Sequence, residues 1–371
     1  MASNAKTVAI AMSGGVDSSV AAALLKRDGY NVIGLTMQLW DYESVGGNVC
    51  HESSCCSVES IDDARAVCQS LDIPHYVIDV RDDFEKHVIS NFITEYMAGR
   101  TPNPCVLCNS MMKWTSLFAK ARLLDADMIA TGHYAQIVHG DGKGRHMMLK
   151  GIDDGKDQSY ALWALTQEQL ARTLFPVGRF SKKQIRQYAD DMDLKTKDQE
   201  ESQEICFIPD NDYGRFLRER LPAIQEQLKG GEIVDTNGDV LGHHNGYPFF
   251  TIGQRKGLGI SVGKPLYVLD IDPDNNQIVV GDKADLDTNG LIAGSVNWVS
   301  IEPPQEAVEA VVKIRYNDTG KAATVLPRDD GSVRIMFNHS HQAVTPGQSA
   351  VFYNENRVLG GGIIMNRLFH D

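Results

Sequence analysis

Two kinds of hydrophobic pattern alternate along the first half of the chain. Short apolar runs predict buried strands at 7–12, 31–40, 74–80 and 128–135. Between them lie Ala- and Leu-rich or amphipathic segments, which predict helices at 16–29, 57–72, 84–99 and 116–127. Because strands and helices alternate, we expect an α/β doubly wound parallel sheet that binds ligands at the carboxyl ends of its strands.

The pattern changes at about residue 211. A short predicted helix at 212–221 is followed by Gly-rich segments with frequent turn signals, and strand-like segments follow one another after about residue 283. The sequences "DDGS" (329–332) and "NENR" (354–357) are typical of hairpin turns. We therefore expect three domains. They are an α/β domain (1–210), a small β-rich central domain (211–282) and a C-terminal antiparallel β-barrel (283–371).

Composition narrows the class of protein. No apolar run approaches the roughly 18 residues that span a bilayer, and the N-terminus lacks a signal-peptide layout, so we expect a cytoplasmic protein without a membrane partner. The net charge of −13 argues against a protein that coats nucleic acid, but not against a specific RNA enzyme. The seven cysteines are an odd number, which makes a structural disulfide framework a poor explanation.

The segment "SGGVDSS" (13–19) follows the first predicted strand and begins the first predicted helix. Gly14 and Gly15 allow a sharp turn and a close backbone approach to a ligand, and the helix start offers N–H groups to a phosphate. Asp17 could hold Mg²⁺. No Lys follows the glycines, so this is not the P-loop pattern. A plain Gly turn before a helix would explain the same residues without a ligand.

The cysteines leave several interpretations open. Cys105 and Cys108 have the CxxC spacing of metal or redox sites. Cys206, between Ile205 and Phe207, could equally be a buried inert thiol. The segment "CHESSCC" (50–56) forms a weak zinc pattern, and Cys68 falls inside a predicted amphipathic helix, where a core position is expected.

The loop resembles that of the pyrophosphatase-loop family, whose fold is adenine nucleotide alpha hydrolase-like and whose members cleave ATP to AMP and pyrophosphate. The resemblance implies ATP and Mg²⁺ as cofactors. It implies that ATP contacts Ala11, Met12, Ser13, Gly14, Gly15, Val16, Asp17, Ser18, Met37 and Gly132.

Five further motifs occur in order: "GRTPNPCVLCN" (99–109), "ATGHYA" (130–135), "GKDQSYALWAL" (155–165), "ESQEICFIP" (201–209) and "TIGQRKGLGI" (251–260). Together with the β-rich C-terminal part they are similar to the tRNA-specific 2-thiouridylases, over nearly the whole chain. The resemblance implies that ATP adenylates the C2 oxygen of the wobble uridine, that an enzyme persulfide supplies sulfur, and that AMP leaves. A persulfide suits this step because it ionises more readily than a thiol.

The same resemblance assigns roles to residues. Cys206 becomes the persulfide carrier, and Cys108 the thiol that releases the sulfur and ends in a disulfide with it. Contacts with tRNA are implied for Asn103, Pro104, Cys105, His133, Lys156, Asp157, Gln158, Arg315, Tyr316 and Gln348. The implied partners are tRNAs for Lys, Glu and Gln and a cysteine desulfurase or sulfur-relay protein.

Cys105 is a departure from the family pattern, since some members carry Asp there, and a thiol is a poor general base. The three cysteines Cys105, Cys108 and Cys206 could instead hold a [4Fe–4S] cluster. Two further classes of protein also fit parts of the sequence. One is a different pyrophosphatase-loop enzyme, such as an amidotransferase-linked synthetase or a tRNA lysidine synthetase, and the other is a non-catalytic tRNA- or Fe–S-binding protein.

Two local expectations concern prolines and basic residues. Pro102 and Pro104 are expected to stiffen an extended segment that carries the two cysteines. Basic residues Lys182, Lys183 and Arg186 share one predicted helix and could face RNA, and Arg315–Tyr316 is expected on a barrel strand, although a solvated face would explain each of them equally well.

Overall fold

Five parallel strands form the sheet of the N-terminal part, in the order β3-β2-β1-β4-β7. The computed structural model describes residues 5–40, 58–141, 144–199 and 205–369. The strands are β1 (Thr7–Ala11), β2 (Asn31–Gln38), β3 (His75–Asp79), β4 (Met128–Ala130) and β7 (Thr173–Leu174). The four predicted strands are therefore confirmed, except that the fourth ends at Ala130 and the "ATGHYA" motif continues as a loop. The short β7 was not predicted.

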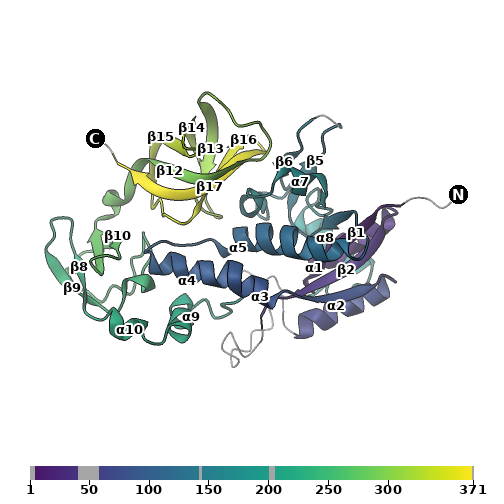
Figure 1. Ribbon diagram of the computed structural model, residues 1–371, viewed down its shortest axis with the longest axis horizontal. Helices are drawn as coiled ribbons and strands as arrows, with labels where there is room; N and C mark the ends of the chain where they lie inside the picture. The colour runs from purple at the N-terminus through teal and green to yellow at the C-terminus, as the bar shows by residue number, and fades with distance from the viewer. Residues whose placement is uncertain (1–4, 41–57, 142–143, 200–204, 370–371) are drawn as a thin grey trace.

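Helices cover both faces of this sheet, as expected for a doubly wound fold (Figure 1). On one face α1 (Val16–Arg27), α2 (Val58–Ser70) and α8 (Lys182–Asp191) pack on alternate residues of β1, Val8 and Ile10. On the other face, Ala9 of β1 contacts a cluster that includes Trp114, Leu117 and Phe118. The alternation along β1 thus sends neighbouring residues into two separate cores.

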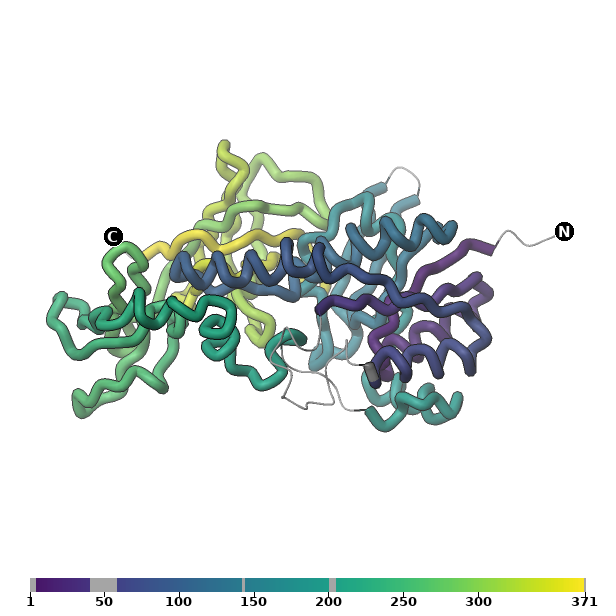
Figure 2. Tube along the Cα trace, turned by 60° about the horizontal axis from the view of Figure 1, so that its bottom comes forward, coloured from purple at the N-terminus to yellow at the C-terminus, as the bar shows by residue number. Residues whose placement is uncertain are grey.

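Two long helical runs connect the sheet to the rest of the molecule (Figure 2). The first consists of α3 (Arg81–Phe84), a π-helical stretch η2 (Glu85–Ile89) and α4 (Ser90–Met97), and it ends before Gly99, whose φ is +68°. The second consists of α5 (Pro104–Leu107), a π-helical stretch η3 (Cys108–Leu117) and α6 (Phe118–Arg122). A helix was expected only from residue 116.

The expectation of an extended segment through both cysteines is therefore wrong. Pro104 occupies the start of α5, where its missing N–H costs no helical hydrogen bond. Asn103 is extended, with φ −116° and ψ 90°, as the residue before a proline prefers. Cys105 and Cys108 consequently lie one turn apart on a helix, and Cys108 is the first residue of the π-helical stretch.

The C-terminal part is a closed antiparallel barrel of six strands, in the order β12-β15-β14-β13-β16-β17, and the β12–β17 pairing closes it. Its strands are β12 (Asp287–Trp298), β13 (Val308–Lys313), β14 (Lys321–Pro327), β15 (Val333–Gln342), β16 (Ser349–Asn354) and β17 (Arg357–Leu368). The fold class and both predicted hairpin turns are confirmed, since 329–332 joins β14 to β15 and 354–357 joins β16 to β17.

A hairpin from the N-terminal part extends the barrel sheet. Strand β5 (Ala135–Val138) pairs with β6 (Met147–Lys150), and β6 pairs in turn with β17 through Arg357 and Val358. Strand pairing as well as side-chain packing therefore joins the barrel to the N-terminal part of the chain, although the parallel sheet itself remains a separate sheet.

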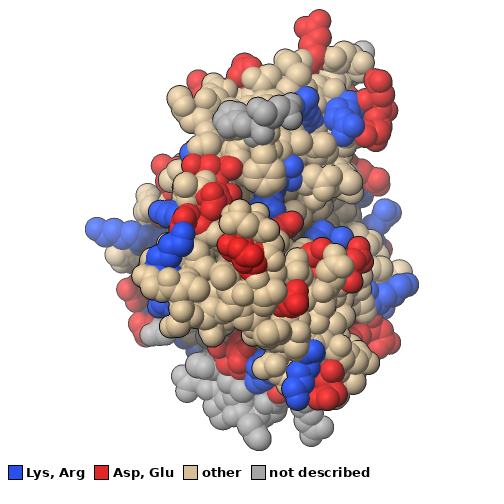
Figure 3. Space-filling view, turned by 90° about the vertical axis from the view of Figure 1, so that its left-hand side faces the viewer, with Lys and Arg blue, Asp and Glu red and all other residues tan. Residues whose placement is uncertain are grey.

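The middle of the chain forms a small unit around a four-stranded sheet, β10-β11-β8-β9. Its elements are α9 (Tyr213–Arg220), α10 (Ile224–Gln227), β8 (Gly231–Val234), β9 (Val240–His244), η5 (Tyr247–Phe249), β10 (Tyr267–Asp272), β11 (Gln277–Gly281) and η6 (Lys283–Leu286). It adjoins the end of the first long helical run, where Tyr247 donates a hydrogen bond to the carbonyl of Met97 at 2.7 Å. The face seen in Figure 3 carries acidic and basic side chains intermixed, so it is not a uniformly basic surface.

Two short helices, η4 (Ser159–Leu162) and α7 (Gln167–Ala171), complete the described elements of the N-terminal part. Tyr160 and Leu162 of η4 and Leu170 of α7 belong to the same hydrophobic cluster as Trp114, so both helices pack between the parallel sheet and the barrel. Among the described helices, none combines the length and the apolar character that crossing a bilayer demands.

Candidate active site

The loop between β1 and α1 lies at the carboxyl end of the parallel sheet. Gly15 is the N-cap of α1 and offers no side chain to the first-turn N–H groups. The hydroxyls of Ser18 and Ser19 donate to the carbonyl of Gly15, at 3.0 and 2.9 Å, and the hydroxyls of Ser13 and Ser18 lie 3.2 Å apart. The serines therefore fix the shape of the loop, while its N–H groups suit the phosphates of a nucleotide.

Two glycines are required by close backbone packing. Gly14 has a φ of +75°, and a Cβ there would lie 2.3 Å from the carbonyl oxygen of Ser60 in α2. A Cβ on Gly132 would lie 2.7 Å from the amide nitrogen of Ser18 and 2.8 Å from the carbonyl carbon of Asp17. The loop after β4 therefore packs directly on the first turn of α1, and both loops implied for ATP meet at one place.

The other residues expected to contact ATP surround this point. Met12 and Val16 are 2% and 3% exposed, so their side chains anchor the loop in the hydrophobic core. The carbonyl of Met12 accepts a hydrogen bond from the Thr36 hydroxyl at 3.0 Å. Ala11 ends β1 and Met37 lies near the end of β2, where it is partly buried.

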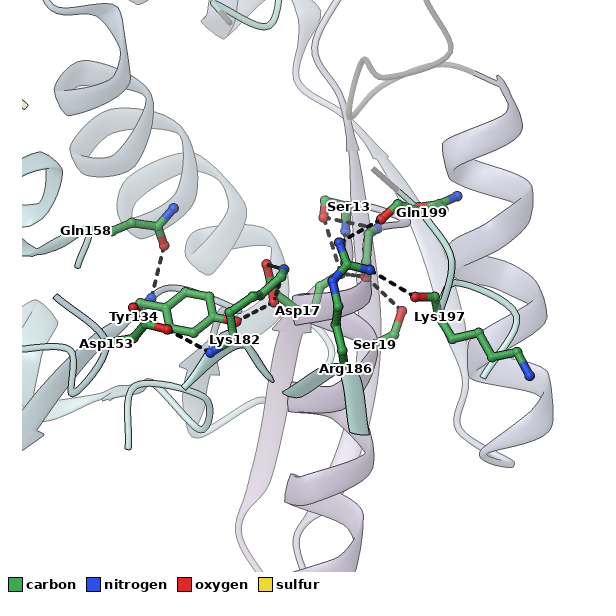
Figure 4. A network of polar contacts seen from close by, with 12 residues as sticks. Ser13, Asp17, Ser19, Tyr134, Asp153, Gln158, Lys182, Arg186, Lys197 and Gln199 are labelled. Carbon is green, nitrogen blue, oxygen red and sulfur yellow. Dashed lines mark hydrogen bonds and ion pairs between the residues drawn. The ribbon is translucent and has the colours of Figure 1, made fainter. Parts of the chain in front are cut away.

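Asp17 is the centre of a polar network that the sequence did not predict (Figure 4). Its carboxylate accepts hydrogen bonds from Lys182 Nζ at 2.8 and 2.9 Å and from the Tyr134 hydroxyl at 2.7 Å. Tyr134 also pairs with Gln158, whose side-chain oxygen accepts from the Tyr134 N–H at 3.0 Å. The network thus links the loop, the "ATGHYA" motif and the "GKDQSYAL" segment.

A second network joins the nucleotide loops to the helix of Cys108. Lys113 Nζ donates to Asn109 Oδ1 at 2.9 Å and lies 3.3 Å from His133 Nε2. Burial, with the Lys113 ammonium beside the ring, lowers the pKa of His133 well below its ordinary value. The neutral ring accepts from Lys113 and donates through Nδ1 to the Thr131 hydroxyl at 2.7 Å.

The two cysteines with implied catalytic roles contact the same hydrophobic cluster. Cys108 and Cys206 are both half-buried, and both pack against a core that contains Phe84, Phe92 and Phe207. The ring of Phe207 lies edge-on to Phe92, with centroids 5.3 Å apart. Although 98 residues separate Cys108 and Cys206 in the sequence, the fold packs both against one hydrophobic cluster, while Cys105 is exposed.

An iron–sulfur cluster finds no support in the arrangement of the side chains. Within the described ranges, no group of three or more His, Cys, Asp or Glu side chains is placed to hold a metal ion, and Cys105, Cys108 and Cys206 are within those ranges. Cys68 is buried in α2, and burial raises its pKa to about 12, so it is a core thiol as expected. The predicted zinc pattern at 50–56 lies outside the described residues.

The "TPNP" segment is held by the barrel. Gln348 Nε2 donates to the carbonyls of Thr101 and Pro102, both at 3.0 Å, and the Thr101 N–H donates to the carbonyl of Pro346 at 2.9 Å. Two residues implied to contact tRNA, Gln348 and Asn103, are therefore neighbours in space. Gln348 also has an internal role, because its hydrogen bonds fix the irregular segment that leads to Pro104.

The loop that carries Arg315 and Tyr316 faces the same region. It connects β13 to β14, so the expectation that these residues lie on a barrel strand is wrong. Tyr316 is 44% exposed, and its ring centroid lies 6.3 Å from that of Tyr160, whose hydroxyl donates to the carbonyl of Ser349 at 2.8 Å, next to Gln348. Arg315 is exposed. An exposed cation and ring thus lie beside the segment that precedes Cys105.

Asp318 gives that loop its shape. Its carboxylate accepts from the backbone N–H groups of Ile314 and Gly320, at 2.9 and 3.1 Å, and lies 3.0 Å from His341 Nε2. Burial opposes ionisation, but these hydrogen bonds prevail and lower the pKa of Asp318 to about 2. The loop is therefore held in one conformation by an ionised side chain.

Within "GKDQ", the three residues implied to contact tRNA differ in exposure. Lys156 and Gln158 are partly exposed, whereas Asp157 is 9% exposed. The carboxylate of Asp157 accepts from the N–H groups of Gly151 and Ser159 at 3.1 Å each and from the Ser159 hydroxyl at 2.9 Å. Its side chain therefore shapes the segment, and the predicted contact with tRNA stays a prediction.

The expectation that Lys182, Lys183 and Arg186 form one RNA-facing surface is wrong. Lys182 is 9% exposed and paired with Asp17. Arg186 donates to the carbonyls of Lys197 and Gln199, at 3.1 and 3.4 Å, which holds that segment against α8. Lys183 alone of the three is exposed.

Three residues were not predicted for this site: Lys113, Tyr134 and Lys182. Tyr134 lies inside a motif that was singled out, and Lys113 follows Asn109 by four residues, the spacing of one helical face. Lys182 carries no such signal, because its partner Asp17 is 165 residues away.

Gly132→Ala is expected to weaken ATP binding by about tenfold or more, which corresponds to about 1.4 kcal/mol. The new Cβ would displace the backbone of Asp17 and Ser18, and with it the N–H groups of the loop. Calorimetric titration with ATP measures the change. Gly155→Ala is a matched control, since a Cβ there meets nothing closer than 3.4 Å. Unchanged affinity in the Gly132 variant would contradict this position for the nucleotide.

An all-parallel sheet, a Gly-rich loop at its carboxyl edge and an attached β-barrel define a nucleotide-binding α/β protein of the HUP class. Family models match residues 6–210 (tRNA methyl transferase HUP domain), 215–282 (tRNA methyl transferase PRC-barrel domain) and 288–364 (Aminomethyltransferase beta-barrel domain). The chain belongs to the family of the tRNA-specific 2-thiouridylase MnmA proteins.

Curated relatives of that name cover almost the full chain. The protein of Amoebophilus asiaticus is 50% identical over 361 residues, 96% of this chain and 94% of the relative. That of Salinibacter ruber is 48% identical over 358 residues, again 96% and 94%. That of Carboxydothermus hydrogenoformans is 48% identical over 365 residues, 98% of each chain.

Solved structures resemble the chain more remotely. The NMN synthetase of Francisella tularensis is 16% identical, with a TM-score of 0.32, over 55% of this chain and 68% of that one. A 4-thiouridine synthetase in complex with RNA and bound ATP is 14% identical, with a TM-score of 0.33, over 59% of this chain and 51% of that one.

Proposed function

We propose that this protein is an ATP-dependent tRNA uridine 2-sulfurtransferase that acts on the wobble uridine. The observation that carries the proposal is the meeting of two loops and one helix at the carboxyl edge of the sheet. Gly132 packs on the first turn of α1, and the adjacent His133 contacts Lys113 on the helix of Cys108. A nucleotide on the loop would therefore lie near the helix that carries Cys108, to which the loop after β4 is joined through His133 and Lys113.

The first step in this proposal activates the base. The C2 oxygen of the uridine attacks the α-phosphorus of ATP, an O–P bond forms, and the bond to pyrophosphate breaks. The loop N–H groups at 13–18 would hold the phosphates, and Asp17 would hold Mg²⁺ that neutralises them. The adenylated oxygen then leaves as AMP, which is a far better leaving group than an amide-like oxygen.

The second step delivers sulfur. Cys206 would carry a persulfide received from a cysteine desulfurase or a sulfur-relay protein, and its terminal sulfur would attack C2. Attack of the Cys108 thiolate on the sulfur of Cys206 breaks the S–S bond, leaves 2-thiouridine and AMP, and forms a Cys108–Cys206 disulfide. A thiol reductant must then reopen this disulfide. Packing of both cysteines on one hydrophobic cluster supports the pairing.

The tRNA-facing surface in this proposal surrounds Cys105. Gln348 is bonded to the two residues before Asn103, Tyr316 lies beside Tyr160, which is bonded to Ser349, and Arg315 is exposed on the same loop as Tyr316. A flipped uridine could stack on an exposed ring while a cation contacts the phosphate backbone. tRNAs for Lys, Glu and Gln are the proposed acceptors, and the cell's cytoplasm, where tRNA is modified, is the proposed location.

One assay tests the function. The protein is incubated with ATP, Mg²⁺, bulk tRNA and a cysteine desulfurase with cysteine, and the digested tRNA is analysed by mass spectrometry. We expect 2-thiouridine at the wobble position of those three acceptors, and one AMP for each thiouridine formed. A reaction without ATP is the control and should give none. Absence of both thiouridine and AMP in the complete reaction would refute the proposal.

A further inference from the structure

Cys105 and Cys108 are neighbours on one turn of a helix. Cys105 is the second residue of α5, and Cys108 follows the last residue of α5 and begins η3. In α-helical geometry the Cα atoms of residues three apart are separated by about 5 Å. A disulfide spans Cα separations of about 4.4–6.8 Å, so these two thiols are close enough to form one within the existing fold.

The hydrogen bonds of this turn bring the two side chains into line. The N–H of Cys108 donates to the carbonyl of Cys105 as well as to that of Pro104. The bond to Cys105 spans three residues, as in a 3₁₀-helix, in which side chains three positions apart eclipse each other. The side chains of Cys105 and Cys108 therefore follow one line along the helix.

The three cysteines of the site differ in exposure. Cys105 is exposed, whereas Cys108 and Cys206 are half-buried and pack against the cluster that contains Phe207. A disulfide between Cys108 and Cys206 would be partly covered by this cluster, which limits its attack by a dissolved thiol. A disulfide that includes Cys105 would instead present an exposed sulfur atom to the solvent.

The helical turn is fixed to the rest of the molecule on both sides. The segment before α5 is held by the hydrogen bonds of Gln348, and Asn109 Nδ2 donates to the carbonyl of Ala161 at 3.0 Å. Cys105 is therefore held one turn from Cys108 by the fold itself. A thiol held beside its target reacts faster than the same thiol in solution, because no second molecule has to be brought into place.

We propose that Cys105 is a third thiol of the reaction cycle, which takes over the disulfide from Cys206. This inference rests on the Cys108–Cys206 disulfide of the proposed function. The Cys105 thiolate, whose proton goes to solvent, attacks the sulfur of Cys108. A Cys105–Cys108 bond forms, the Cys108–Cys206 bond breaks, and Cys206 leaves as a thiolate. The number of disulfides is unchanged, so the exchange itself consumes no oxidant or reductant.

The exchange has two consequences for the cycle. Cys206 becomes a thiolate again and can accept the next persulfide before any reductant has acted. A small thiol such as glutathione then attacks the exposed sulfur of Cys105, and Cys108 leaves as a thiolate. A second glutathione attacks the mixed disulfide on Cys105, which restores the Cys105 thiolate and releases oxidised glutathione.

Disulfide mapping during a single turnover tests the exchange. The full-length protein is charged with persulfide by a cysteine desulfurase, separated from it, and mixed with ATP, Mg²⁺ and tRNA. Samples are stopped with acid at increasing times, alkylated, digested and analysed by mass spectrometry. We expect the Cys108–Cys206 disulfide to appear first and the Cys105–Cys108 disulfide to replace it without added reductant. A Cys108–Cys206 disulfide that persists while Cys105 is alkylated would overturn the inference.

A recovery assay measures what the exchange contributes. After one turnover the spent enzyme is desalted, exposed to glutathione for measured times, desalted again and given a second turnover. We expect Cys105→Ser and Cys105→Asp to recover about tenfold more slowly than the wild type, because glutathione must then attack the half-buried disulfide. Each variant is normalised to its own first turnover, so a change in tRNA contact cancels. Cys68→Ala, which removes a buried thiol, is the control and should recover at the wild-type rate.

The outcomes separate the inference from the proposed function. If the wild type forms no 2-thiouridine in the first turnover, the proposed function fails and the inference fails with it. If thiouridine forms and both Cys105 variants recover as fast as the wild type, the inference fails and the function stands. A slower first turnover with unchanged recovery would assign Cys105 to tRNA contact alone, which also overturns the inference.

Discussion

Cys206→Ser is expected to abolish formation of 2-thiouridine while pyrophosphate is still released on tRNA. A serine hydroxyl cannot carry a persulfide, but the first step of the proposed reaction needs only ATP, the base and the loop at 13–18. Mass spectrometry of digested tRNA measures the 2-thiouridine formed, and a single-turnover assay measures the pyrophosphate released. The expected loss of thiolation is complete to the limit of detection.

The control for this variant is Cys68→Ala. Cys68 is fully buried in α2, and its pKa, raised to about 12 by burial, makes it unreactive. Its replacement should leave thiolation near the wild-type level, at a small cost in stability. Thiolation by Cys206→Ser at the wild-type rate would remove Cys206 from the mechanism. Loss of pyrophosphate release as well would mean that Cys206 belongs to the nucleotide site.

Asp157→Ala is expected to lower the free energy of unfolding by about 3 kcal/mol, since each buried donor that loses its acceptor costs about 1 kcal/mol or more. The change leaves three such donors, the N–H groups of Gly151 and Ser159 and the Ser159 hydroxyl, without the carboxylate that accepts them. The Ser159 hydroxyl also lies 3.2 Å from the hydroxyl of Tyr353, so the loss extends into the barrel. Urea denaturation followed by tryptophan fluorescence measures the change.

A nearby residue provides the comparison. Asp154 is exposed, so Asp154→Ala alters the net charge by the same amount without opening a buried network. It should unfold within about 0.5 kcal/mol of the wild type. If Asp157→Ala and Asp154→Ala unfold at the same urea concentration, the buried hydrogen bonds of Asp157 do not stabilise this segment.

The parallel sheet was predictable because its central strands are buried on both sides and read as apolar runs. Strands β1, β2 and β3 agree with the predicted runs to within two residues at each end. The helix that carries Cys105 and Cys108 was not predictable in the same way. Its two nearby prolines favour an extended chain, and the same Pro104 also fits the first position of a helix, so packing against the sheet decides between them.

The residues of the candidate site also fall into two groups, those that local motifs predict and those that depend on a distant partner. The loop at 13–18 and Gly132 were found from short motifs, in which glycines are dictated by local backbone geometry. Lys182 was mistaken for a surface residue because a lysine in an amphipathic helix is usually exposed. Its burial depends on a long-range partner, Asp17, and a pattern within one helix holds no information about such a partner.

The pairing of β6 with β17 limits how the C-terminal barrel can be exchanged between related proteins. The barrel closes on itself, but it is not an independent domain at the end of a linker, because its strand β17 also pairs with a hairpin encoded about 200 residues earlier. An exchange of C-terminal segments between related chains would have to bring a matching hairpin with it. Recombination should therefore preserve the two segments together, as one inherited unit that is discontinuous in the gene.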